Sequence, residues 1–356
     1  MSDEQEPWED AWSDENTTPG KVEAALREML ATRHHESHAF VPARVLNLVA
    51  IADREYRGEI ENRLQRVGRF NPSRLILCLV SEGRETVDAS VQIGTSQFAG
   101  PGHIAVGRER IGLHIGPKHL PKLDTIVDPL LVPDLATMVW APHGHGEGVD
   151  ALRRLAQIVL LDSQDEPTVA GGFERSADIA GNAYVVDLAW LRSTPWRERV
   201  AAAFDSPQER SQLGAIASVT VRHREDSLAA AVLFCGWLSS RLGWKPGSLA
   251  PASGRLTGHA RAKRQEVKIT LEPANQDAPG LAGVTIETAS GEAVSLDRAE
   301  GGLRSLRRAR DGSEQSWTVL GASRGEAGIL GEGVRQALLR DPTYAPALRC
   351  ARVFVS

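Results

Sequence analysis

Two groups of histidines contain the residues of this sequence that could bind a metal ion. Within residues 34–38, His34 and His38 are four positions apart and would share one face of a helix. His143 and His145 follow a predicted strand, which is where α/β folds place functional loops. Neither group has the HExxH pattern or a third ligand at a fixed spacing. We therefore interpret the first group as the polar last turn of a helix and the second as a solvated turn, and we expect no metal site.

The common motifs for cofactors and nucleophiles are missing from the sequence. No GxGxxG pattern follows the first predicted strand, and neither a Walker A sequence nor a GxSxG turn occurs. Gly331-Glu332-Gly333 looks like a phosphate-binding turn, but its apolar neighbours have helical spacing, so we expect it to lie within a helix. The sequence therefore predicts no cofactor and no catalytic group of residues, and hence a protein that is not an enzyme.

The cysteines and the apolar segments indicate the compartment. Cys78, Cys235 and Cys350 are far apart and form no CxxC pair, which is typical of a reducing environment. No basic and apolar leader opens the chain, and the most apolar run, residues 228–238, is too short to cross a bilayer. We expect a cytoplasmic protein that does not bind membranes.

Charge is unevenly distributed along the 356 residues. The 46 acidic and 41 basic residues give a net charge of −5, which argues against a nucleic-acid binder. Residues 1–15 hold seven acids and no base, so we expect a disordered acidic tail over residues 1–16.

A basic stretch in the C-terminal half could bind a phosphate group or an acidic partner. Its cations lie within eight positions of one another and are opposed by a single acid, Glu266. The candidate residues are Arg261, Lys263, Arg264 and Lys268.

Alternating strands and helices predict an α/β domain over residues 17–165. Residues 44–52 and 74–80 read as buried strands, and the segment between them has apolar residues at helical spacing. Further short strands and helices follow as far as residue 161. This order predicts a mainly parallel sheet with flanking helices.

The remaining residues, 166–356, predict an α+β domain. Thr194-Pro195 is typical of a helix start, and residues 227–242 are apolar nearly all round, as in a buried helix. Short strands and turns over residues 254–319 predict an antiparallel sheet, and a further helix follows over residues 325–340.

Several separate stretches carry a family resemblance through their order and spacing. They are residues 17–19 (TTP), 42–49 (PARVLNLV), 71–74 (NPSR), 131–137 (LVPDLAT), 162–163 (DS), 187–190 (DLAW), 194–197 (TPWR) and 341–344 (DPTY). Together they resemble the glucose-6-phosphate dehydrogenase assembly protein (OpcA) family. The likeness runs from about residue 17 to the C-terminus and is strongest before residue 205.

The resemblance implies a non-catalytic assembly factor and allosteric activator of glucose-6-phosphate dehydrogenase. In that role the protein would support the oxidative pentose phosphate pathway and NADPH production, with the dehydrogenase as its partner. An activator of this kind binds one state of the enzyme better than another, so it needs no cofactor of its own. A second hypothesis stays open, namely a sugar-phosphate-binding enzyme or sensor that uses the basic residues from Arg261 to Lys268.

The stretch most characteristic of the family also supplies candidate contact residues for the partner. Tryptophan and arginine often dominate the binding energy of interfaces. We therefore hypothesise that Trp190, Thr194, Pro195, Trp196 and Arg197 contribute to the contact surface. The alternative is that Trp190 ends a core strand and Trp196 packs against the helix that follows.

Overall fold

The chain divides into two compact units. The first holds residues 1–161 and 182–186, and the second holds residues 162–181 and 187–356. The structure, a computed structural model, describes residues 8–36, 41–42, 44–68, 72–97, 105–320 and 326–356. The division falls close to the boundary predicted after residue 165, but the chain returns to the first unit for one more strand.

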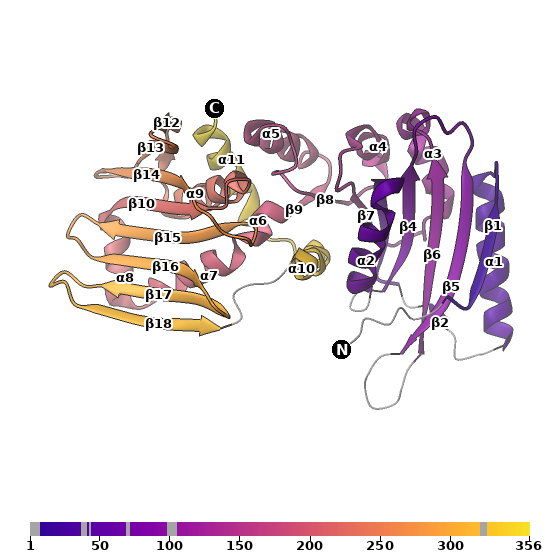
Figure 1. Cartoon of the computed structure of the whole chain (residues 1–356), viewed down its shortest axis with the longest axis horizontal. Helices are drawn as coiled ribbons and strands as arrows, with labels where there is room; N and C mark the ends of the chain where they lie inside the picture. The colour runs from indigo at the N-terminus through magenta and orange to yellow at the C-terminus, as the bar shows by residue number, and fades with distance from the viewer. Residues whose placement is uncertain (1–7, 37–40, 43, 69–71, 98–104, 321–325) are drawn as a thin grey trace. The chain divides into compact units, whose positions relative to one another are not determined.

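Among the described residues of the first unit, nine strands form one sheet (Figure 1). In spatial order they are β1 (Asp10–Asp14), β5 (Asp88–Gln97), β6 (Ala105–Ile115), β4 (Ser73–Val80), β3 (Leu46–Asp53), β7 (Thr137–Trp140), β8 (Ile158–Leu161) and β9 (Tyr184–Asp187), with β2 (Val41–Pro42) beside β6. The strands from β6 to β8 pair in parallel, whereas β5 and β1 are antiparallel. The mainly parallel sheet predicted for this domain is confirmed.

Two long helices pack on this sheet because both the strands and the helices present apolar side chains. The residues of β3 from Leu46 to Ala52 are all buried, which is typical of a strand covered on both faces. Helix α1 (Pro19–Glu36) packs on β5, and α2 (Arg57–Gly68) packs on β3. The shorter helical segments are η1 (Arg54–Tyr56), η2 (Pro117–Lys122), α3 (Leu123–Val127), η3 (Asp128–Leu130), α4 (Gly146–Ala151) and η4 (Leu152–Arg154).

The expectation of a disordered acidic tail is wrong for residues 10–14, which form β1. This strand pairs with β5, and Arg33 of α1 forms ion pairs with Glu9 (2.7 Å) and Asp10. Composition alone suggested disorder because the cation that neutralises these acids lies on a different element. Residues 1–7 of the predicted tail lie outside the described part of the chain.

The second unit, over its described residues, is built on a mostly antiparallel sheet, as predicted. In spatial order the strands are β11 (Lys245–Pro246), β13 (Arg255–Arg261), β14 (Glu266–Pro273), β10 (Ile216–His223), β15 (Leu281–Thr288), β16 (Ala293–Ala299), β17 (Gly302–Arg308) and β18 (Glu314–Leu320), with β12 (Ala250–Ala252) beside β13. Only the β10–β14 pair among these described strands is parallel.

The described helices of the second unit are α5 (Val169–Ile179), α6 (Leu188–Arg192), α7 (Thr194–Ala203), α8 (Pro207–Gln212), α9 (Leu228–Leu242), α10 (Glu326–Leu339) and α11 (Tyr344–Phe354), with the short turn η5 (Leu213–Ala215). Helices α7 and α9 pack on the sheet, α6 and α11 pack on α9, and α5 and α10 pack on α11 and α6, respectively (Figure 1). Helix α9 is buried from Ala229 to Gly236 and packs on β10, β14 and α11. The predicted buried helix is therefore confirmed.

One strand belongs to a different sheet from the one predicted. The segment around Val185 forms β9 at the edge of the first unit's sheet, whereas the sequence placed it in the C-terminal domain. The strand then ends at Asp187, and α6 begins at Leu188, so Trp190 lies on a helix and does not end a strand. Local apolarity predicts a strand, but it does not say which sheet edge the strand joins.

Two smaller expectations are confirmed. Gly331 and Gly333 lie within α10, and His34 and His35 lie in the last turn of α1, whereas His38 falls outside the described residues. Within the part of the chain that the structure describes, no helix is long and apolar enough to cross a membrane.

The close approach of α9 to α11 at Gly236 gives a test of this packing. A Cβ added at Gly236 would lie 2.3 Å from the Ala347 carbonyl oxygen, so we expect Gly236→Ala to destabilise the second unit by about 1–3 kcal/mol. In Gly331→Ala the new Cβ meets nothing within 4 Å, so helix propensity should raise stability by up to about 1 kcal/mol. The midpoints of urea unfolding, followed by circular dichroism, measure both effects. Equal midpoints for the two variants would contradict the close approach.

Candidate functional site

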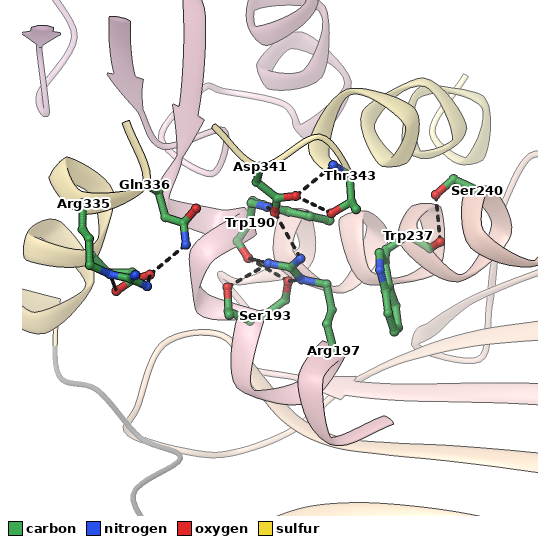
Figure 2. Close-up of polar contacts among 11 residues, drawn as sticks. Trp190, Ser193, Arg197, Trp237, Ser240, Arg335, Gln336, Asp341 and Thr343 are labelled. Carbon is green, nitrogen blue, oxygen red and sulfur yellow. Dashed lines mark hydrogen bonds and ion pairs between the residues drawn. The ribbon is translucent and has the colours of Figure 1, made fainter. Parts of the chain in front are cut away.

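Three segments of the second unit meet around the Trp190 ring (Figure 2). Helix α6 carries Trp190, α7 carries Arg197, and Asp341 lies between α10 and α11. The Trp190 Nε1 donates a hydrogen bond to Asp341 Oδ2 at 3.0 Å. The Arg197 guanidinium stacks on the indole, with its Cζ 3.4 Å from the ring centre, and forms an ion pair with the same Oδ2 at 3.5 Å. One carboxylate oxygen therefore holds both the indole and the guanidinium.

The other donors of Arg197 are satisfied by the turn between α6 and α7 (Figure 2). Its Nε donates to Ser193 Oγ at 3.1 Å, and its Nη2 donates to Thr194 Oγ1 at 2.8 Å. Ser193 Oγ in turn donates to the Trp190 carbonyl oxygen at 2.8 Å. Burial lowers the pKa of Arg197 to about 10 against the opposing charge of Asp341, so the guanidinium is charged at neutral pH. The flat stack with directed donors is geometry that arginine offers and lysine does not.

A second carboxylate, Asp187, organises the start of α6. Its Oδ1 accepts hydrogen bonds from the backbone N–H groups of Ala189 (3.0 Å) and Ser163 (3.1 Å), and its Oδ2 accepts one from the Tyr344 hydroxyl (2.9 Å). Burial, followed by the charge of Asp162, raises the pKa of Asp187 to about 6, although the hydrogen bonds from Ser163 and Tyr344 act in the opposite direction. The desolvation of a fully buried carboxylate outweighs these hydrogen bonds.

Further contacts join this carboxylate to the Trp190 cluster. The Tyr344 ring meets the Trp190 ring edge-on, with the ring centres 5.5 Å apart. Asp162 forms a buried ion pair with Arg192 at 2.6 Å. The stretches DS, DLAW, TPWR and DPTY, which are far apart in sequence, are therefore packed against one another.

The structure buries most of the residues predicted to contact a partner. Trp190 is 2% exposed, Trp196 is 1% exposed and Arg197 is 8% exposed, whereas Thr194 and Pro195 are half-buried. Direct contact with a partner is therefore open only to Thr194 and Pro195 in this arrangement, and it stays a prediction. Trp190, Trp196 and Arg197 can affect a contact surface only indirectly, by holding its exposed residues in position.

The family-like stretches of the first unit also converge on buried polar groups. Arg44 and Arg74 both form ion pairs with Glu109, whose side chain is 2% exposed. Arg74 Nη1 also donates to the Leu130 carbonyl oxygen at 3.0 Å. Two arginines share one carboxylate here, which compensates the cost of burying that carboxylate.

Asn47 holds a neighbouring loop in the same way. Its Nδ2 donates to the Val132 carbonyl oxygen (3.1 Å), and its Oδ1 accepts from the Val132 N–H (2.9 Å). Asn47 and Arg74 lie near the amino ends of β3 and β4. Ligands of parallel sheets bind at the carboxyl ends of the strands, so this polar cluster stabilises the fold and is not placed for catalysis.

The basic residues of the alternative hypothesis lie around the hairpin that joins β13 and β14. Arg261 ends β13, Lys263 and Arg264 lie in the turn, and Lys268 lies on β14. All four side chains are exposed, and none forms an ion pair with another of the described residues. They form an open surface, which suits a partner with complementary charge.

The second histidine group is not the solvated turn that the sequence suggested. His145 Nε2 lies 3.1 Å from Asp53 Oδ1, and the His145 side chain is 12% exposed. His143 stacks on Tyr56, with the ring centres 4.1 Å apart. This cluster lies where β3 and β7 end. Because these two strands are neighbours in the sheet, the residues that follow them are brought together, and the sequence did not predict this pairing. No group of metal-binding residues large enough to hold an ion occurs among the described residues.

The three cysteines are free thiols, and two of them are inaccessible. Burial raises the pKa of both Cys78 and Cys235 to about 12. Cys350 on α11 is half-buried, and desolvation raises its pKa as well. Raised pKa values leave little thiolate at neutral pH, so these residues are weak nucleophiles.

Comparison with protein families assigns both parts of the chain. Residues 64–178 match the family described as the N-terminal domain of the glucose-6-phosphate dehydrogenase subunit. Residues 183–348 match the family described as the C-terminal domain of the same subunit. The chain belongs to the OpcA family. The resemblance predicted from the sequence is confirmed.

The relatives that the chain matches are named as OxPP cycle proteins. OpcA of Synechococcus elongatus is 26% identical over 65% of this chain and 54% of its own length. OpcA of Synechocystis sp. is 25% identical over 76% of this chain and 57% of its own length. The chain therefore spans about half the length of these curated relatives.

Solved structures show a weaker similarity. An oxidoreductase domain protein from Kribbella flavida is 13% identical, with a TM-score of 0.48 over 86% of this chain and 95% of that chain. The super-repressor mutant of Gal80p from Saccharomyces cerevisiae is 9% identical, with a TM-score of 0.47 over 86% and 94%. Similarity at this level does not indicate a shared activity.

The buried carboxylate predicts a specific pH dependence. The pKa of Asp187 rises from 3.8 to about 6 on folding, so its contribution to stability is fully present below pH 4 and is lost as the pH rises through 6. We expect the loss to be on the order of 3 kcal/mol. Asp187→Asn should remove this dependence while keeping the acceptor for Ser163 and Ala189. Urea unfolding of both proteins between pH 4 and 7 measures the difference, and parallel curves would contradict the assignment.

The stacked guanidinium predicts that replacing Arg197 by lysine lowers stability more than the same replacement of Arg199 on the same helix. Arg197→Lys should destabilise the second unit by about 2 kcal/mol, because it removes the stack and two directed hydrogen bonds. Arg199→Lys is the control, since Arg199 has no polar partner among the described residues. Thermal unfolding measures both variants. Unchanged stability of Arg197→Lys with lost partner binding would instead support a direct contact.

Proposed function

We propose that the chain is a non-catalytic assembly factor and allosteric activator of glucose-6-phosphate dehydrogenase. The observation that carries this proposal is the pair of family matches, since both matched domains are described as parts of a glucose-6-phosphate dehydrogenase subunit. In this role the protein acts in the oxidative pentose phosphate pathway and supports NADPH production.

The use of polar residues in the two units supports a binding role over a catalytic one. Asp162, Asp187, Asp341 and Glu109 are buried or half-buried carboxylates in the family-like clusters, and each is engaged by donors from the chain itself. The two buried thiols have strongly raised pKa values. A general base or nucleophile must be free to reach a substrate, which these groups are not.

Activation then follows from differential binding. A subunit that binds the active or assembled state of the dehydrogenase more tightly than other states shifts the population toward that state. A tenfold preference is worth about 1.4 kcal/mol, so a modest interface is sufficient. No chemistry on this chain is required.

Reconstitution with the cognate dehydrogenase tests the proposal. The two purified proteins should elute together in size-exclusion chromatography, and the dehydrogenase should show a higher kcat/KM or a larger assembly when this chain is added. Bovine serum albumin at equal concentration is the control for non-specific stabilisation. The absence of both co-elution and any change in rate, substrate affinity or assembly would contradict the proposal.

The sugar-phosphate alternative is favoured by one observation, the exposed cations of the β13–β14 hairpin. Under this hypothesis, glucose 6-phosphate alone would raise the melting temperature of the chain. Replacing Arg261 and Arg264 by alanine would abolish the shift. A shift of this kind in the absence of dehydrogenase binding would favour the alternative over the main proposal.

A further inference from the structure

The sheet of the second unit has one face that its own described helices do not cover (Figure 1). Apolar residues such as Val219, Ile269 and Ile286 are buried on the helical face. The residues between them point to the opposite face, because side chains alternate along a strand. These alternate residues form the open face, and most of them are polar, with Leu306 and Ala293 among the exceptions.

A row of hydroxyl groups crosses the middle of the open face. Successive members of the row are directly opposite one another on neighbouring strands, so their side chains lie on one side of the sheet. From β13 to β16 the row consists of Thr257, Thr270, Thr220, Thr285 and Ser295. Thr285 and Ser295 are hydrogen-bonded to each other at 3.1 Å.

The charges beside this row are mostly neutralised within the face. Arg222 pairs with Asp297 at 2.7 Å across Gly283, where a Cβ would collide with both side chains. Other pairs are Arg255 with Glu272 at 2.9 Å and Arg308 with Glu287 at 3.0 Å. These three pairs leave the central part of the open face nearly neutral.

One corner of the open face is different. Lys245, Arg261 and Lys268 point to this face, since Lys245 is opposite Arg261 on β13, and Lys268 is opposite His259 on the same strand. Lys263 and Arg264 extend from the adjoining turn. We call these five residues the basic corner. All five are exposed, and none has an ion-pair partner among the described residues.

The charge pattern selects the kind of occupant. Five unpaired cations with a single nearby carboxylate, Glu266, attract a surface that carries a cluster of acidic groups. A second copy of this open face offers no such cluster, because its carboxylates Asp297, Glu272 and Glu287 are already paired. A nucleic-acid duplex would need a cationic stripe along its length, whereas here the cations are concentrated in one corner and Arg304 lies apart from them on β17.

The dimensions of the open face suit a protein interface. Strands lie about 4.8 Å apart, and side chains on one face repeat about every 6.7 Å, so seven strands and three rows span an area of roughly 600 Å². This area is close to the roughly 800 Å² per partner of a standard protein interface.

We propose that the open face of the second unit is the docking surface for glucose-6-phosphate dehydrogenase, and that the basic corner receives an acidic patch of that enzyme. This inference rests on the proposed function, because it names the surface by which the two proteins associate. The half-buried members of the hydroxyl row supply a polar contact area, whereas Thr270 is 6% exposed, and the corner supplies the attraction and the orientation.

Charge reversal in the corner tests the proposal with the full chain and the cognate dehydrogenase. Arg261→Glu/Lys268→Glu should weaken binding at least tenfold at low salt and should remove most of its dependence on sodium chloride. Lys122→Glu/Arg349→Glu is the matched control, since it changes the net charge equally at two exposed residues, on η2 and α11, that lack ion-pair partners among the described residues. Biolayer interferometry at 50 and 300 mM salt measures all three proteins, and circular dichroism checks that they are folded.

A neutral variant tests the rest of the face. Thr220→Tyr adds bulk in the middle of the hydroxyl row while keeping a residue that favours strands, and it should also weaken binding of the dehydrogenase. Wild-type affinity in both the corner variant and Thr220→Tyr would overturn the docking surface while leaving the proposed function intact. Failure of the wild-type chain to bind the dehydrogenase would overturn both. Loss of self-association or of nucleic-acid binding in the corner variant, with dehydrogenase binding unchanged, would overturn the assignment of the partner.

Discussion

The buried carboxylate of Asp187 is the interaction on which the helical layer of the second unit depends. It joins the loop after β8, the first turn of α6 and the start of α11 through its contacts with Ser163, Ala189 and Tyr344. A carboxylate removed from water is tolerated only when its oxygens are hydrogen-bonded, so the three segments must meet for the chain to fold. Trp190 follows three residues later, and this spacing on α6 brings its ring to the Tyr344 ring and to Asp341.

Glu109 has the corresponding role in the first unit, where it is shared by Arg44 and Arg74. The stretches that resemble the OpcA family therefore belong largely to the buried framework of the two units. Substitutions in these stretches act first on stability. Under the proposed function, the dehydrogenase contacts surfaces that this framework holds in place. In the second unit such a surface is available on the sheet face opposite the helices, where hydroxyl groups and paired charges adjoin an unpaired basic corner.

Sequence patterns predicted the two sheets and the buried helix because these elements carry their own periodicity. The apolar run of β3 and the nearly all-round apolarity of α9 read directly as a buried strand and a buried helix. The predictions that failed involve partners distant in sequence. The acidic segment at residues 10–14 is ordered by Arg33 and β5, and β9 joins the first unit after a helical excursion into the second. The composition of a segment does not predict which strand edge it will pair with or which cation will neutralise its charge, because these partners lie far away in the sequence.

The sequence alone determined the family, the two sheet types, and the buried strand and helix that contain Cys78 and Cys235. Each of these follows from residue order or apolar spacing. Only the tertiary structure decided that Trp190 and Arg197 stack inside the protein, because a tryptophan and an arginine suit an interface and a buried cation–π pair equally well. The choice between the two is made by Asp341, which lies about 150 positions further along the chain and reaches both groups only after folding.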